Sequence, residues 1–235
     1  MERHDAAALR TAGTLALVGG IIAAIANLVH PIIDDGATTE EFIAVVSDTW
    51  YWTPLHLLIG AGVLILVAAF AVAAPTFPRP AARHAAQVAL VLGVLSGAIF
   101  VIQIAGIDGI AFRYLADAGT DTELVALLQD LDVALLSLSI ALFMGATAAV
   151  FGVALLADAR YPSWLGWLAV VAGLGNLVTG VIQGFAGLSD LTVTYLFRPL
   201  AGGVIVVIIG FGITARRLGS RSETEQPVEH ASASA

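Results

Sequence analysis

The 235-residue sequence contains no cysteine and no lysine, and only 12% of its residues are charged. Without cysteine the chain cannot form disulfides, Fe–S clusters or thiolate zinc sites, and its redox compartment cannot be inferred. The shortage of charge excludes a soluble globule of this length, because 59% of the residues are hydrophobic and too few polar side chains remain to cover one. The composition therefore places the chain in a lipid bilayer.

The charge that is present is mainly negative. Asp and Glu number 18 against 10 basic residues, all of them arginine, which gives a formal net charge of −8. An acidic, lysine-free membrane protein is typical of a halophilic or high-GC prokaryote. The sequence has no phosphate loop, nucleophile elbow, Rossmann glycine pattern or nucleic-acid motif, so it favours a non-enzymatic role and no nucleic-acid partner.

Six apolar runs are each long enough to cross the hydrocarbon layer, which takes about 20 helical residues. They cover residues 11–33, 53–74, 85–107, 133–157, 164–186 and 192–215. We predict an all-α, polytopic membrane protein with a six-transmembrane-helix bundle at 11–215, a lead at 1–10 and a disordered tail at 216–235. Glycine pairs at four-residue spacing, such as Gly93 and Gly97 or Gly180 and Gly184, permit close helix contact within the bundle or in a homo-oligomer.

The loops between the runs contain two further helix signals. TTEEFIAVV in the first acidic loop predicts a short surface helix with Thr38 or Thr39 as N-cap. In the loop at 108–132, Thr120-x-x-Glu123 is a capping-box pattern, so a helix is expected to start there and extend the fourth span beyond the membrane. The triplet Trp50–Trp52 at the start of the second span has rings that favour the lipid headgroup level.

The arginines indicate how the chain is oriented. With both termini in the cytoplasm, eight arginines lie on the inner side and only Arg113 and Arg198 lie on the outer side. Under the positive-inside rule this split predicts a multi-pass protein of the cytoplasmic membrane with both termini inside. Twelve of the acidic residues then lie on the outer side, which makes that surface acidic.

Counting about 20 residues from each inner boundary brings several polar side chains to one depth near the outer face. They are His30, His56, Gln103, Gln183 and Arg198, with Asp132 slightly above them. The inner two thirds of the spans lacks ionisable groups, which argues against an ion pump or a hydrophilic pore. We predict an outer polar pocket that binds a small or amphipathic ligand or stabilises a membrane-protein partner.

Each of these residues also has a structural interpretation. His30 precedes Pro31 and can close a helix, and His56 can bond a neighbouring helix. The two glutamines can act as hydrogen-bond links between helices. Arg198 can form a salt bridge with Asp132, Asp108 or Asp190.

Other functional interpretations use the same residues. His30 and His56 could be the axial ligands of haem b, with Arg198 pairing a propionate. The two histidines with one carboxylate would be a minimal zinc set that lacks an evident general base. Transport of a substrate is a further alternative.

The stretches RTAGTLALVGGIIAAIANLVHP and LFMGATAAVFGVALLADARYPSWLGWLAVVAGL, with Pro162–Trp167 as their most specific part, carry a family resemblance. With its six-helix plan, the chain resembles a family of small prokaryotic integral membrane proteins known only as a domain of unknown function. The resemblance covers about half of the chain. It implies the six-helix fold and no activity, cofactor or site residue.

Overall fold

The computed structural model describes residues 3–31, 37–119, 122–189 and 191–224, and within these ranges it contains helices and no strand. The α-helices are α1 (Arg3–Val29), α2 (Thr39–Asp48), α3 (Trp52–Ala73), α4 (Pro80–Val101), α5 (Phe112–Ala118), α6 (Thr122–Ser139), α7 (Ala148–Leu156), α8 (Ser163–Ala186) and α9 (Arg198–Thr224). A 3-10 turn, η1 (Ala74–Thr76), and three π-helical segments, η2 (Ile102–Ala111), η3 (Ile140–Thr147) and η4 (Leu191–Phe197), continue or connect them.

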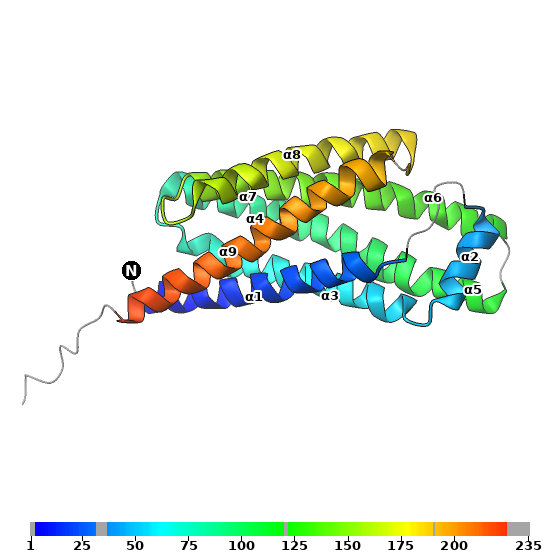
Figure 1. The fold of residues 1–235 in the computed structure, drawn as a ribbon, viewed down its shortest axis with the longest axis horizontal. Coiled ribbons are helices and arrows are strands. Elements are labelled where there is room, and N and C mark those ends of the chain that lie inside the picture. Colours follow the sequence, from blue (N-terminus) through cyan, green and yellow to red (C-terminus); the bar gives the residue numbers. More distant parts are fainter. Residues whose placement is uncertain (1–2, 32–36, 120–121, 190, 225–235) are drawn as a thin grey trace, which may run out of the picture.

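Joined end to end, these elements make six helices long and apolar enough to cross a membrane (Figure 1). The prediction of an all-α bundle with six membrane-length helices is confirmed. Large apolar side chains remain on the outside of the bundle, among them Leu28 at 85% exposure and Phe185 at 92%. Such side chains are stable against lipid tails, because contact with hydrocarbon carries no hydrophobic penalty.

The third span extends much further than the sequence indicated. The loop expected at 108–132 is helical over most of its length, because η2 and α5 continue α4 as far as Ala118 and α6 begins at Thr122. The expected start of the fourth helix near Thr120 lies at residues outside those described, and the extension of that helix beyond the predicted span is confirmed. We call the end of the bundle formed by α2, α5 and the start of α6 the cap end.

Helix α2 lies across the cap end, beside α5 and α6 (Figure 1). Of the two expected N-caps, Thr38 is confirmed, and it forms a full capping box: the backbone N–H of Glu41 donates to the Thr38 hydroxyl, and the backbone N–H of Thr38 donates to the Glu41 carboxylate. The buried face of α2 packs against α5 and α6 in a cluster of Phe42, Val46, Trp52, Phe112 and Val125. The Trp52 ring, which was expected to settle at the lipid headgroup level, is fully buried in this cluster and so does not face the headgroups.

Both described chain ends lie at the opposite end of the bundle, which we call the tail end (Figure 1). There Arg160 pairs with Asp158 at 2.7 Å and donates to the Thr76 carbonyl at 2.8 Å. Burial raises the pKa of the neighbouring Tyr161 phenol above its usual range. These contacts tie the α7–α8 turn to the end of α3.

Helix α1 starts at Arg3, inside the predicted lead, and α9 runs to Thr224, so residues 216–224 of the predicted disordered tail are helical. Arg10 donates to the Gly219 carbonyl at 3.1 Å. A Cβ at Gly219 would lie 2.5 Å from the Ala6 carbonyl oxygen, so the two helix ends are in close contact. Packing between α1 and α9 therefore keeps residues 216–224 helical; residues 225–235 lie outside those described.

Helix α9 contacts α1 at the tail end and α8 towards the cap end. Near the tail end Gly13 and Gly212 face each other so closely that a Cβ at Gly13 would lie 2.6 Å from the Gly212 carbonyl oxygen. Further along, Gly175 and Gly203 mark the contacts of α8 and α9. Figure 1 shows α9 crossing from α1 to α8. The two helices therefore diverge towards the cap end, where a cavity lies between them.

Helix α8 packs against η3 and α7 through glycines, and this contact supplies the first prediction. A Cβ at Gly173 would lie 2.5 Å from the Ala149 backbone nitrogen, whereas a Cβ at Gly202 would meet no atom within 4 Å. We expect Gly173→Leu to lower the free energy of unfolding by about 3 kcal/mol, because two helix backbones must separate. Thermal unfolding in detergent measures the loss.

Gly202→Leu is the matched control for this change and should alter stability by no more than about 0.5 kcal/mol. Equal thermal stability of the two variants would contradict the close contact of α8 with α7.

Candidate functional site

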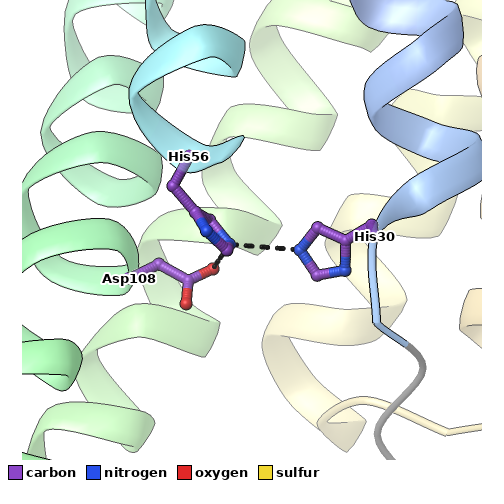
Figure 2. Close-up of side chains that lie close together, drawn as sticks. All are labelled: His30, His56 and Asp108. Carbon is purple, nitrogen blue, oxygen red and sulfur yellow. Dashed lines mark hydrogen bonds and ion pairs between the residues drawn. The ribbon is translucent and has the colours of Figure 1, made fainter. Parts of the chain in front are cut away.

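Two histidines face each other at the cap end of the bundle. His56 lies one turn into α3 and is fully buried, and His30 directly follows α1. Their Nε2 atoms are 3.2 Å apart, and their rings meet edge to face with centroids 5.0 Å apart (Figure 2). The two imidazoles thus come from different spans to one point, whereas the depth count predicted only a shared level.

The tautomer of each ring follows from its backbone partner. His56 Nδ1 is 2.7 Å from the Trp52 carbonyl oxygen, and His30 Nδ1 is 2.9 Å from the Pro31 carbonyl oxygen. A carbonyl oxygen only accepts hydrogen bonds, so both Nδ1 atoms must carry hydrogen. In the neutral rings both Nε2 atoms therefore present a lone pair towards the site.

Asp108 completes the cluster. Its Oδ2 lies 3.1 Å from His56 Nε2, and the three ligand-type atoms of His30, His56 and Asp108 lie within 4.8 Å of one another (Figure 2). The carboxylate is largely buried, with a side-chain exposure of 13%. A negative charge and two nitrogen lone pairs therefore meet in a site that is mostly shielded from solvent.

The π-helical geometry of η2 explains how Asp108 reaches this position. Gln103 and Asp108 are five residues apart, which in an α-helix separates two side chains by about 140° around the axis. In a π-helix the bonding partner of residue i is residue i+5, so residues at this spacing share a face. Both side chains consequently line the same cavity.

Helix α3 fixes η2 in this place. Trp52 Nε1 donates to the Asp108 carbonyl at 2.7 Å, and the Thr53 hydroxyl donates to the Gly109 carbonyl at 2.6 Å. A Cβ at Gly109 would lie 2.6 Å from the His56 Cβ, so only glycine permits this approach. The Trp52 ring lies over His56 with centroids 4.5 Å apart, which closes one side of the site.

Beside the histidines is a cavity of about 440 Å³. Its walls include side chains from α1, α3, η2, α6, α8 and α9. Polar residues line it near the cap end, and deeper in the bundle its lining is apolar, with Val63, Leu66, Phe143, Met144 and Ile208. The volume falls in the range of small-molecule sites, about 300–1,000 Å³.

Five of the six predicted pocket residues line this cavity. The sixth, His56, does not line it but contacts His30, which does. The Gln103 amide donates to Asp132 Oδ1 at 2.9 Å, so Gln103 links the third and fourth spans as one interpretation proposed. Gln183 is buried without a hydrogen-bond partner for either amide atom in the described part of the chain. It does not act as a link between helices there.

Arg198 lines the cavity and acts electrostatically on His30. Within the described ranges it forms no ion pair with Asp132 or Asp108, so the expected structural salt bridge to these residues is not found; Asp190 lies outside the described residues. Among the described residues, no carboxylate is thus in contact with the Arg198 guanidinium.

The sequence interpretation missed two residues of the site. Asp108 was considered only as a partner for Arg198, because it was placed in a loop, and Trp52 was assigned to the headgroup level. A signal for Asp108 was present in its spacing of five from Gln103, but only a π-helix makes that spacing meaningful.

Comparison of the chain with protein-family models, curated proteins and solved structures found no match. The resemblance to a six-helix family therefore stays a prediction, and the function has to be argued from the site itself.

The hydrogen bonds from Trp52 and Thr53 of α3 to carbonyl groups of η2 lead to the second prediction. We expect Thr53→Val to lower the free energy of unfolding by about 1 kcal/mol or more, because the isosteric side chain leaves the Gly109 carbonyl without its donor. Thermal unfolding in detergent measures the change.

Thr14→Val is the control, since the Thr14 hydroxyl is exposed and bonds only its own helix at Arg10. A loss of stability for Thr53→Val no greater than for Thr14→Val would contradict the inference that the Thr53 hydrogen bond holds η2 against α3.

Proposed function

We propose that the protein binds an amphipathic ligand with an anionic head in the cavity beside His30. The observation that carries the proposal is the distribution of residues around the cavity, which is polar near the cap end and apolar towards the middle of the bundle. A molecule with a charged head and a hydrocarbon tail matches this distribution, as a water-soluble ligand would not.

The polar part of the cavity holds hydrogen-bonding groups that lack partners. Both amide atoms of Gln183 and the Oε1 atom of Gln103 are buried without one in the described structure. A buried polar atom without a partner costs about 1–3 kcal/mol. A ligand head, or water held in its place, offsets this cost, and Gln183 supplies both a donor and an acceptor to it.

Arg198 favours an anionic head. A guanidinium at this depth is costly unless it has a counter-charge, and no described carboxylate is in contact with it. Its fork of N–H donors suits a phosphate or carboxylate group. A negative head beside Arg198 would therefore supply the counter-charge that the described carboxylates do not.

The divergence of α1 and α9 supports access from the lipid. Ala23 and Ala26 of α1 face the cavity from one side, and Phe197, Arg198 and Ile205 face it from the other. In this proposal the tail enters between the two helices from the surrounding hydrocarbon. Since the arginine distribution predicts that the cap end is external, the ligand would come from the outer leaflet. This lateral path also avoids the acidic outer surface.

The alternative of haem b is less compatible with the geometry. Two axial nitrogens of about 2.0 Å bond length lie on opposite faces of a porphyrin, about 4 Å apart, with the macrocycle between them. His30 and His56 have their Nε2 atoms 3.2 Å apart and their rings in direct contact. A visible spectrum of protein expressed with sufficient haem tests this alternative, and a Soret band that His56→Gln removes would support it. Transport and a scaffolding role for a membrane partner stay alternatives without a specific observation in their favour.

The proposal predicts that filling the cavity abolishes binding. We expect Ala23→Trp to weaken binding of dodecyl phosphate to the purified protein at least about tenfold, because the indole occupies the apolar path beside α1. Isothermal titration in a non-ionic detergent measures the affinity. Leu28→Trp puts the same side chain on the exposed face of α1 and should leave the affinity unchanged.

Charge selectivity gives a further prediction. We expect Arg198→Gln to weaken binding of dodecyl phosphate about tenfold or more and to leave binding of neutral dodecyl maltoside unchanged, because only the anionic head pairs with the guanidinium. Equal binding of both probes by the unaltered protein, or no saturable binding of either, would overturn the proposal.

A further inference from the structure

We propose that His30, His56 and Asp108 bind a divalent transition-metal ion, with Zn²⁺ as the best match. The starting observation is that three acceptor atoms converge on one point. None of the three carries a hydrogen that it could donate to the other two. Both Nδ1 atoms are committed to backbone carbonyls, which leaves the Nε2 lone pairs directed at each other and at the carboxylate of Asp108.

Acceptors this close repel one another unless a cation lies between them. A proton on His56 Nε2 can be donated in good geometry to Asp108 or to His30, and the other acceptor is then poorly satisfied. A metal ion accepts a lone pair from all three atoms at once. The burial of His56 and Asp108 makes an unsatisfied arrangement costly, which favours the ion.

The distances agree with this assignment. Bonds of about 2.0–2.1 Å to a tetrahedral Zn²⁺ place neighbouring ligand atoms about 3.3 Å apart. The separations of His56 Nε2 from His30 Nε2 and from Asp108 Oδ2 are 3.2 Å and 3.1 Å. The third pair lies within 4.8 Å, so the His30 and Asp108 side chains need to approach by at most about 1.5 Å.

The surroundings are those of a metal centre. Histidine ligands of zinc usually donate their other N–H to a carbonyl or carboxylate, which fixes the ring, and both rings here do so. Asp132 acts electrostatically on both Asp108 and His56, so a divalent cation would compensate two nearby carboxylates. Imidazole and carboxylate ligands suit Zn²⁺ rather than Mg²⁺ or Ca²⁺, which prefer oxygen ligands.

The inference deepens the proposed function at the same site. His30 and Asp108 line the cavity, so a coordination position left open by three protein ligands would face it. An anionic head could then bind between the metal ion and Arg198. The ion would thus contribute to recognition of the head as well as to the stability of the cap end.

The test uses the 235-residue chain in a non-ionic detergent, freed of metal with a chelator and then titrated with Zn²⁺ in the absence of dodecyl phosphate or any other anionic amphiphile. We expect one Zn²⁺ per chain by elemental analysis and a rise of about 5 °C or more in Tm at a hundredfold excess over Kd. Asp108→Asn, which keeps the shape of the side chain, and His30→Gln should each weaken Zn²⁺ binding at least about tenfold.

His84→Gln is the matched control, because His84 is exposed near the tail end and its Nδ1 contacts only the Pro80 carbonyl of its own helix. It should bind Zn²⁺ like the unaltered chain. Substitution of Co²⁺ gives a second readout that does not depend on stability: visible absorption typical of four-coordinate Co²⁺ is expected for the unaltered chain and His84→Gln, and not for Asp108→Asn.

No saturable Zn²⁺ binding by the folded protein, or equal binding by Asp108→Asn, His30→Gln and the unaltered chain, would overturn the metal site. Because the Zn²⁺ titration omits dodecyl phosphate and the dodecyl phosphate titration can be carried out on metal-free protein, the two proposals fail independently. Zn²⁺ binding without dodecyl phosphate binding would leave the metal site and reject the ligand cavity, and the reverse result would do the opposite.

Discussion

The close contact between η2 and α3 at Gly109 is the interaction on which the candidate site depends. The absence of a Cβ at residue 109 lets η2 approach His56, and Trp52 and Thr53 hold it there through two carbonyl groups. If η2 were displaced by the width of a methyl group, the Asp108 carboxylate would no longer reach His56 Nε2. The position of the cluster residues therefore depends on how closely the backbones of η2 and α3 pack.

A π-helical turn in a membrane protein is unfavourable in free energy unless neighbouring groups bond its backbone. Backbone groups that depart from α-helical bonding need other partners in hydrocarbon, where water is not at hand. In η2 the carbonyls of Asp108 and Gly109 receive side-chain donors from α3, so the same bonds that satisfy the backbone also place the carboxylate. This coupling explains why the π-helical segment lies at the site rather than elsewhere along the span.

The cavity arises from the paths of two helices rather than from missing side chains. Helices α1 and α9 are held together by facing glycines near the tail end, and α9 then follows α8. The space left between them is lined by polar residues near the cap end and by apolar residues deeper in the bundle. In the two proposals, a lipid-like ligand and a metal ion share this cavity, which His30 and Arg198 both line.

Much of this arrangement could be predicted from the sequence because it depends on local composition. The six spans follow from apolar length, the Thr38 cap follows from a four-residue pattern, and the shared depth of His30, His56 and Gln183 follows from a constant rise per residue. These properties do not require knowledge of which helices are neighbours. The sequence alone thus determined the class of fold, and it predicted a common level for these polar side chains.

What only the tertiary structure decided is how each helix is rotated and how far it extends. Apolar residues surround every span, so periodicity carries no information about facing. Trp52 is buried at the cap end, and Arg198 lines the cavity without an ion pair to Asp108 or Asp132. The change from α- to π-helical turns brings Asp108 to the helix face that Gln103 occupies. Contact with α1 keeps residues 216–224 helical. Each of these outcomes depends on atoms far apart in the chain, and for that reason local pattern could not reveal them.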